Sequence, residues 1–317
     1  MVGSRCRGRY RGVRVIKRLV NVFKSGFIGI IGRPNAGKST LFNAIIGDKI
    51  SIISDKPQTT RNKITGIKNV PDAQLIFLDT PGMHRPKTPL NKAMVQTTKE
   101  TIDSVDVLLM LVEANTGIRP HDLFLIESLE STNVPVILVI NKIDLIEKKY
   151  LLPLMDKFRT LYDFQEIFPI SALTGEGIED LINLVKDMLP DGPQYYPDDV
   201  QTDATERFIA AEFIREKITL LTKQEIPYST AVEIDLFKED EEKNLIRISA
   251  AINVEKESQK AILIGRRGAM LKTIGTQARM DMEKLFGARV YLELFVRVKK
   301  DWTSSEKLLQ EFGIVKP

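Results

Sequence analysis

The sequence has a single cysteine, two histidines and no long hydrophobic run. As the lone cysteine, Cys6 leaves no partner for an intrachain disulfide, so we expect a reducing compartment, the cytoplasm. The longest apolar runs, within residues 107–112 and 134–140, are far shorter than the ~20 residues that a membrane-spanning helix needs. Residues 201–317 contain neither cysteine nor histidine, which disfavours a metal or nucleophile centre in that part of the chain.

Charge is distributed unevenly. The chain holds 46 Lys and Arg against 42 Asp and Glu, a net charge of +4. Residues 1–24 carry eight of the basic side chains and no acidic one, whereas residues 25–200 are net acidic. We interpret this basic N-terminal arm, 1–24, as an RNA-contacting arm or as the product of an upstream start codon. An organelle targeting peptide is disfavoured, because the segment is poor in serine and has no clear amphipathic face.

Short apolar runs alternate with helical patterns between residues 25 and 190. Strands are predicted over 27–31, 75–79, 107–112, 135–140 and 166–170. Helices are predicted over 38–46, 91–103, 121–131, 151–162 and 177–188. Continuous apolar strands that alternate with helices are typical of a mostly parallel sheet covered on both faces, so we expect an α/β domain over 25–190.

A second domain is predicted after a linker. Residues 191–203 are rich in proline and aspartate and lack periodicity, which is typical of a domain boundary. Residues 204–317 then mix both element types and indicate an α+β domain with a short C-terminal helix. Its expected elements are helices over 204–222, 257–264 and 269–286, strands over 231–237, 245–254 and 289–299, and an acidic turn over 238–244.

The segment GRPNAGKS at 32–39 lies between a predicted strand and a predicted helix, and it matches the phosphate-loop pattern G-x-x-x-x-G-K-[ST]. Its glycines let successive backbone N–H groups point at phosphate oxygens. Lys38 is predicted to reach the β- and γ-phosphates, and the Ser39 hydroxyl to bind Mg²⁺. The predicted nucleotide contacts in this segment are Gly32, Arg33, Pro34, Asn35, Ala36, Gly37, Lys38, Ser39 and Thr40.

DTPG at 79–82 ends the predicted strand 75–79. Asp79 is expected to hold Mg²⁺ through water, and the Gly82 N–H to bind the γ-phosphate. Thr80 and Pro81, between them, are also predicted nucleotide contacts.

Two more motifs follow predicted strands and indicate that the bound nucleotide carries a guanine base. In NKID at 141–144, Asp144 is placed to accept hydrogen bonds from guanine N1–H and N2–H₂, with Asn141 and Lys142 bracing the loop and ring. Adenine offers neither donor in that arrangement, and buried hydrogen bonds left unmade strongly disfavour the wrong base. In SAL at 171–173, the Ala172 N–H is predicted to donate to guanine O6, with Ser171 and Leu173 beside it.

The motifs GRPNAGKS, QTTRN, DTPG, NKID and SAL together resemble GTP-binding proteins of the translation-factor-related class. The chain resembles the bacterial Era family over about residues 26–315. The sequences that carry this resemblance are GRPNAGKST, QTTRN and DTPGMH, followed by the C-terminal module described below. The resemblance implies GTP and GDP as ligands, Mg²⁺ as cofactor and the reaction GTP + H₂O → GDP + phosphate. It also makes Thr59 and Thr60 candidates for switch I, and one of the two is expected to reach Mg²⁺ through its hydroxyl. The sequence does not decide between them; the predicted metal ligands are Ser39, Thr60 and Asp79.

Hydrolysis is expected to be slow. Many small GTPases carry a glutamine just after the D-x-x-G motif to orient water, and here that position is Met83. His84 follows, but a lone loop histidine is more often solvated than catalytic. Asn35 occupies a position that helps to hold K⁺ in some similar GTPases, so K⁺ is a predicted activator. The predicted catalytic set is Asn35, Lys38, Thr59, Thr60 and Gly82.

The C-terminal module resembles a type II KH domain. GRRG at 265–268 lies between two predicted helices, in the order β-β-α-GxxG-α-β. Its glycines would let the loop lie against a sugar-phosphate backbone, while bases of about four nucleotides lie in the groove beside it. Residues 258–300 carry ten basic and three acidic side chains, which favours RNA. The predicted RNA contacts are Ile264, Gly265, Arg266, Arg267, Gly268 and Lys272.

The resemblance implies a GTP-dependent switch that binds the 3′ end of 16S ribosomal RNA during maturation of the small (30S) ribosomal subunit. A monomer is expected, and the family implies peripheral contact with the inner face of the cell membrane, although no strong amphipathic segment is present. Two other interpretations stay open. One is the GTPase subunit of an RNA-modification system, and the other is an RNA-binding scaffold with weak GTPase activity.

Overall fold

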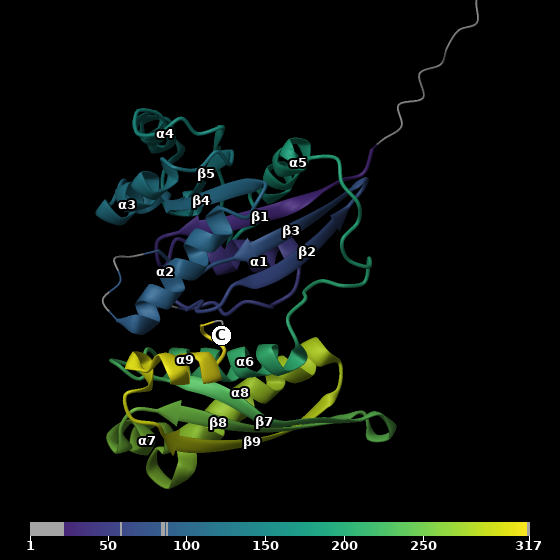
Figure 1. The fold of residues 1–317 in the computed structure, drawn as a ribbon, viewed down its shortest axis with the longest axis vertical. Helices are drawn as coiled ribbons and strands as arrows, with labels where there is room; N and C mark the ends of the chain where they lie inside the picture. Colours follow the sequence, from purple (N-terminus) through teal and green to yellow (C-terminus); the bar gives the residue numbers. More distant parts are fainter. Residues whose placement is uncertain (1–21, 58, 84–85, 87, 316–317) are drawn as a thin grey trace, which may run out of the picture.

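The computed structural model describes residues 22–57, 59–83, 86 and 88–315. The basic segment 1–21 and His84 lie outside the described residues, so their predicted roles stay predictions. Two domains lie one above the other in Figure 1, joined by a strand-free connection on one side. No helix in the described part of the chain is long and apolar enough to cross a membrane.

The N-terminal domain is built on a six-stranded sheet in the order β2-β3-β1-β4-β5-β6. All neighbouring pairs are parallel except β2 and β3. Every residue of β3, β4 and β5 is buried, as expected for strands covered on both faces. The strands are β1 (Lys24–Gly32), β2 (Ile64–Val70), β3 (Ala73–Asp79), β4 (Val107–Glu113), β5 (Val136–Asn141) and β6 (Glu166–Pro169).

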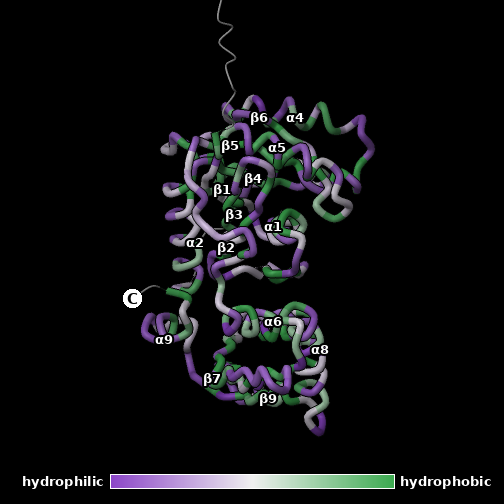
Figure 2. The backbone as a smooth tube through the Cα atoms, turned by 90° about the vertical axis from the view of Figure 1, so that its right-hand side faces the viewer, coloured by the Kyte–Doolittle hydropathy of each residue, from purple (hydrophilic) through white to green (hydrophobic). Residues whose placement is uncertain are grey.

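Five helices cover the two faces of this sheet, and Figure 2 shows hydrophobic segments gathered inside the domain. Each lies within a few residues of its predicted range. They are α1 (Lys38–Ile46), α2 (Pro89–Ile102), α3 (Pro120–Leu129), α4 (Leu151–Arg159) and α5 (Ile178–Met188). β1 begins at Lys24, so the expected boundary of the basic arm falls one residue inside the first strand.

The sequence analysis missed β2. The strand pairs antiparallel with β3 through the two-residue turn Pro71–Asp72, where Asp72 adopts φ 60°. Its apolar residues, Ile64, Ile67 and Val70, are each separated by two residues that are polar or glycine, so it lacks the continuous apolar run of the central strands. Gly66 is needed there, because a Cβ would lie 2.5 Å from the Phe42 ring of α1.

The predicted linker carries no helix or strand after Asp191, yet hydrogen bonds fix it against the edge of the sheet. The buried Gln74 side chain accepts from the backbone N–H groups of Tyr195 (2.8 Å) and Tyr196 (2.9 Å) and donates to the Tyr196 carbonyl (2.8 Å). Farther along, the Thr202 hydroxyl donates to the Thr65 carbonyl of β2 at 2.6 Å. The linker therefore packs as part of the N-terminal domain.

The C-terminal domain packs three helices on one face of a three-stranded sheet in the order β7-β8-β9. β7 and β8 are antiparallel, whereas β8 and β9 are parallel. β7 extends to Asp240, so the predicted acidic turn at 238–244 begins three residues too early. The elements are α6 (Glu206–Leu221), β7 (Ala231–Asp240), β8 (Leu245–Val254), α7 (Glu257–Ile264), α8 (Ala269–Phe286), β9 (Arg289–Val298) and α9 (Glu306–Glu311).

The side of this domain that carries α6 and α9 faces the N-terminal domain, and the sheet lies on the far side (Figure 1). A small apolar cluster joins the two domains. It brings Leu90 and Met94 of α2 against Trp302 and Leu309 near the C-terminus. The domains therefore share a packed interface as well as a linker.

Candidate nucleotide and RNA sites

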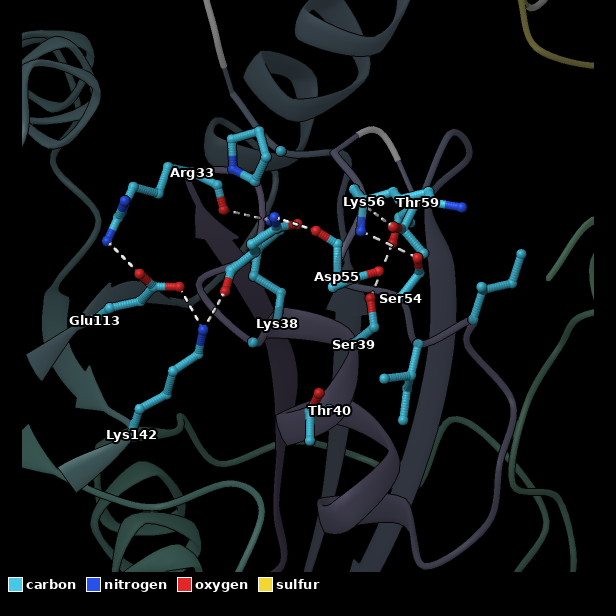
Figure 3. Close-up of a pocket in the computed structure, with 17 residues that line it drawn as sticks. Arg33, Lys38, Ser39, Thr40, Ser54, Asp55, Lys56, Thr59, Glu113 and Lys142 are labelled. Atoms are coloured by element: carbon cyan, nitrogen blue, oxygen red, sulfur yellow. Dashed lines mark hydrogen bonds and ion pairs between the residues drawn. The ribbon is translucent and has the colours of Figure 1, made fainter. Parts of the chain in front are cut away.

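A cavity of about 480 Å³ opens at the carboxyl edge of the parallel strands, the edge where open α/β sheets bind ligands. Its walls come from the phosphate loop, from residues 52–56, 59 and 60, and from the ends of β4 and β5 (Figure 3). The predicted residues that line it are Arg33, Pro34, Asn35, Gly37, Lys38, Ser39, Thr40, Thr59, Thr60, Gly82 and Lys142. The structure thus brings the phosphate loop, both switch-I threonines and one NKID residue to one place.

Backbone conformation holds the phosphate loop open. Gly37 adopts φ 95°, and a Cβ at this position would lie 2.2 Å from Nδ2 of Asn141, so glycine is required. The Lys38 ammonium lies inside the curl of the loop, where it donates to the carbonyls of Gly32 (3.2 Å) and Arg33 (3.1 Å). A phosphate group in the cavity would meet this ammonium and the N–H groups at the start of α1.

The three predicted metal ligands converge. Ser39 Oγ donates to Asp79 Oδ2 at 2.8 Å, and Thr60 Oγ1 lies 2.9 Å from Ser39 Oγ and 3.3 Å from Asp79 Oδ2. Ser51, which the sequence analysis missed, also donates to Asp79 Oδ2, at 2.7 Å. Asp79 Oδ1 is buried and has no hydrogen-bond partner among the described residues. Hard oxygen ligands around an orphaned carboxylate oxygen fit Mg²⁺.

Burial perturbs both charged groups of this site. It lowers the pKa of Lys38 to about 8, and the Asp79 carboxylate opposes that shift. It raises the pKa of Asp79, against the opposing effects of Lys38 and of the three hydroxyl donors. Both shifts reflect charges held out of water, which a phosphate and a divalent cation would compensate.

The base side of the site is organised by Asn141 at the end of β5. Its Nδ2 donates to the Ala36 carbonyl and its Oδ1 accepts from the Ala172 N–H, both at 2.9 Å. In this structure the Ala172 N–H therefore meets Asn141, where guanine O6 was predicted. Ser171 Oγ donates to the exposed Asp144 carboxylate at 2.6 Å and orients it.

Arg33 was predicted as a nucleotide contact, but its guanidinium turns away from Lys38 (Figure 3). It pairs with Glu113 at 2.7 Å and lies 3.4 Å from the buried Asp122 carboxylate. The other oxygen of Glu113 pairs with Lys142, whose Nζ also donates to the Asn35 carbonyl at 2.8 Å. Glu113 and Asp122 were missed, because neither belongs to a motif.

Two other predicted contacts turn into the domain interior. Thr80 Oγ1 donates to the Ile30 carbonyl at 2.7 Å, and the Pro81 carbonyl accepts from Thr98 Oγ1 at 3.0 Å. Both follow a fully buried strand, so they satisfy neighbouring backbone and helix groups. Met83, two residues after Pro81, is completely buried, and its N–H donates to the Gly32 carbonyl at 3.2 Å.

The predicted RNA loop lies between α7 and α8. Gly265 and Gly268 adopt φ 70° and 78°, and a Cβ on Gly265 would lie 2.8 Å from Met270. Arg266, Arg267 and Lys272 are exposed, whereas Ile264 is half-buried. A groove of about 370 Å³ runs beside the loop. Its lining adds residues that the sequence analysis did not assign, namely Leu271, Gly275, Thr276, Arg279, Leu292 and Leu294.

The fold and these sites define a P-loop GTPase joined to an RNA-binding KH domain. Residues 27–142 match the family model described as 50S ribosome-binding GTPase, and residues 225–303 match the KH domain model. The GTPase Era of Syntrophus aciditrophicus is 62% identical over 292 residues, covering 92% of this chain and 95% of that protein. The Geobacter metallireducens GTPase Era is 55% identical over 293 residues, covering 92% and 98%.

Solved structures agree. Era in complex with MgGDPNP and nucleotides 1506–1542 of 16S ribosomal RNA matches with a TM-score of 0.90 and 42% identity, covering 92% of this chain and 99% of that chain. A variant of Aquifex aeolicus Era bound to GDP·AlF₄⁻ matches equally well, covering 92% and 100%. The chain belongs to the Era family. This confirms the predicted fold class and GTPase activity.

Proposed function

We propose that this GTPase binds the 3′ end of 16S ribosomal RNA through its GRRG groove and acts in assembly of the small ribosomal subunit. The observation that supports this most is the likeness to Era in complex with nucleotides 1506–1542 of that RNA, over almost all of both chains. The exposed Arg266, Arg267 and Lys272 supply the phosphate-binding charge.

In the nucleotide site, this chain's residues position groups and stabilise charge. Lys38 and the N–H groups at the start of α1 would bind the phosphates, and Asp144 would select guanine. Ser39, Thr60 and Asp79 would hold Mg²⁺, which neutralises charge that develops on the phosphate oxygens. Met83 is buried and apolar and cannot orient water, so the intrinsic rate is slow.

K⁺ stimulation is the finer part of the proposal. The Asn35 amide lies at the cavity, where its Nδ2 donates to the Asp55 carbonyl at 2.5 Å. An amide oxygen and a loop carbonyl at the phosphates suit a monovalent cation, which would supply charge that an arginine finger provides elsewhere. Faster turnover in KCl than in NaCl, lost in Asn35→Ala, is the expected result; equal rates in both salts contradict it.

Binding of RNA tests the main proposal. Fluorescence anisotropy compares a labelled RNA that matches the 16S 3′ end with a scrambled RNA of equal length, each with GDP or a GTP analogue. The matching RNA should bind more tightly, and its affinity should depend on the nucleotide. Equal affinity for both RNAs would contradict specific binding of the 16S 3′ end and favour an RNA-binding scaffold without sequence preference. Contact with the 30S subunit, a monomeric state and contact with the inner membrane face remain predictions.

A further inference from the structure

Arg61 of the QTTRN segment belongs to the GTPase domain by sequence, but its side chain lies in the KH domain. Its Nη1 donates to the Thr230 carbonyl at 2.6 Å, and its Nη2 donates to the carbonyls of Pro227 (2.9 Å) and Tyr228 (3.1 Å). The guanidinium also lies over the Trp302 ring, 5.7 Å from its centroid. Only 4% of Arg61 is exposed.

A second arginine, which belongs to the KH domain, binds the same segment of the GTPase domain. Arg215 of α6 donates from Nη2 to the Thr59 carbonyl at 2.5 Å. Glu212, one turn earlier, orients the Arg215 guanidinium with two bonds of 2.8 and 2.6 Å. Lys56 extends the contact by donating to the carbonyls of Thr219 and Thr222 at the end of α6.

Thr60 stands between these two anchors. Its hydroxyl points to Ser39 and Asp79, while the residues on either side of it are held by the C-terminal domain. A bond to the backbone of Thr59 and a buried side chain at Arg61 fix the chain path through Thr60. Within the GTPase domain, Thr59 Oγ1 donates to the Lys56 carbonyl at 2.6 Å. Lys56 is itself bound to the carbonyls at the end of α6, so this contact also leads back to the C-terminal domain.

We propose that Arg61 and Arg215 are positioning residues for GTP hydrolysis, through which the KH domain holds Thr60 at the ion site. The proposal rests on the proposed role of Thr60 in binding Mg²⁺. Because linkage is reciprocal, ion and γ-phosphate at the site would favour the docked domain arrangement as much as docking favours them. The carbonyls of Pro227, Tyr228 and Thr230 are the docking site for Arg61, and the KH domain completes switch I.

A double-mutant cycle tests this. Arg61→Met removes the three hydrogen bonds that the guanidinium donates and keeps an unbranched chain of similar length. This variant is compared with wild type, with Thr60→Ala and with the double variant. Arg207→Met is the matched control, because Arg207 lies on the same helix as Arg215 and donates to the Ile234 carbonyl within the KH domain. GTP turnover is measured against Mg²⁺ concentration, and circular dichroism reports folding, because Trp302 lies in contact with Arg61 and its emission would respond to the substitution itself.

In the wild-type background, Arg61→Met should lower kcat and raise the half-saturating Mg²⁺ concentration, each about tenfold, which is a usual coupling between contacting residues. Arg207→Met should change neither. In the Thr60→Ala background, Arg61→Met should change kcat less than about twofold, because its route to the ion is gone. An equal loss in both backgrounds, or none in either, overturns the proposal.

Two further outcomes are distinguishable. Normal Mg²⁺ dependence in Thr60→Ala would contradict the ion-binding role of Thr60 itself and, with it, the proposal built on that role. Should Arg61→Met fail to fold, Arg215→Met replaces it in the same cycle, because it releases the Thr59 carbonyl and leaves the Arg61 contacts in place. The same nonadditivity with Thr60→Ala is then expected, and additive effects overturn the proposal.

Discussion

Ser39 Oγ donates a hydrogen bond of 2.8 Å to Asp79 Oδ2, which joins the start of α1 to the end of β3. The two residues lie 40 positions apart in the sequence. Parallel strands bring them together, because their carboxyl ends meet at one edge of the sheet. This pair forms the base of the proposed ion site, and Thr60 closes it from switch I.

Comparison of Ser39→Ala with Ser51→Ala separates the binding of Mg²⁺ from the hydrogen bonding that stabilises Asp79. Both hydroxyls donate to the same oxygen, Asp79 Oδ2. Only Ser39 also contacts Thr60, so Ser39→Ala should raise the half-saturating Mg²⁺ concentration about tenfold or more. Ser51→Ala should mainly lower the free energy of unfolding, by about 1–2 kcal/mol. Mg²⁺ titration and urea unfolding measure the two effects, and identical Mg²⁺ curves would contradict the assignment.

Nucleotide affinity should fall at alkaline pH. Phosphate binding favours protonated Lys38, whose pKa in the free protein is about 8. Below pH 8 the ammonium is already charged and affinity is flat with respect to this group; above pH 8 affinity falls by up to about tenfold per pH unit. Calorimetry at pH 8 in buffers of different ionisation enthalpy should show uptake of about half a proton. Lys38→Met is the control, because it keeps any titration of the guanine base and should lose this uptake.

Glu113→Gln tests the ion pairs behind the loop. Glu113 binds Arg33 with one oxygen and Lys142 with the other, so a neutral amide should loosen both the phosphate loop and the NKID loop. We expect GDP affinity to fall about tenfold, because partly buried cations lose their partner. Glu127→Gln, at an exposed position on α3, serves as the control. Unchanged GDP dissociation in stopped flow would show that Glu113 has no role in binding.

Arg266→Ala and Arg267→Ala should weaken RNA binding through loss of phosphate contacts. Each contact contributes about one unit to the slope of log affinity against log salt, so each variant should lower that slope by about 1. Lys238→Ala is the control, because Lys238 is exposed on β7 outside the groove. Anisotropy titrations over a range of KCl concentrations give the slopes. Variants with the wild-type slope would place the RNA elsewhere.

Much of the fold was predictable because its strands are strongly patterned. The continuous apolar runs of β3, β4 and β5 predicted strands close to those observed, and the predicted helix 269–286 coincides with α8. β2 was missed because its polar residues hide a strand that only pairing with β3 reveals. The linker was predicted from its composition as a domain boundary, and the composition gave no sign that the buried Gln74 amide fixes it to the N-terminal domain.

The site was predictable where chemistry follows a motif and unpredictable where tertiary contacts decide. Lys38, Ser39 and Asp79 lie where their motifs place them. Arg33 and Thr80 belong to motifs too, but the Arg33 side chain forms an ion pair with Glu113 and the Thr80 hydroxyl donates to the Ile30 carbonyl. No local sequence pattern predicts a tertiary hydrogen-bond or ion-pair partner of this kind.

GTP turnover by the full chain, with and without an RNA that matches the 16S 3′ end, tests the coupling of the two domains most directly. The account predicts that the matching RNA accelerates turnover in KCl, that scrambled RNA does not, and that Arg266→Ala with Arg267→Ala removes the acceleration. GTP turnover that is the same under all of these conditions would contradict a linked switch and leave two independent sites on one chain.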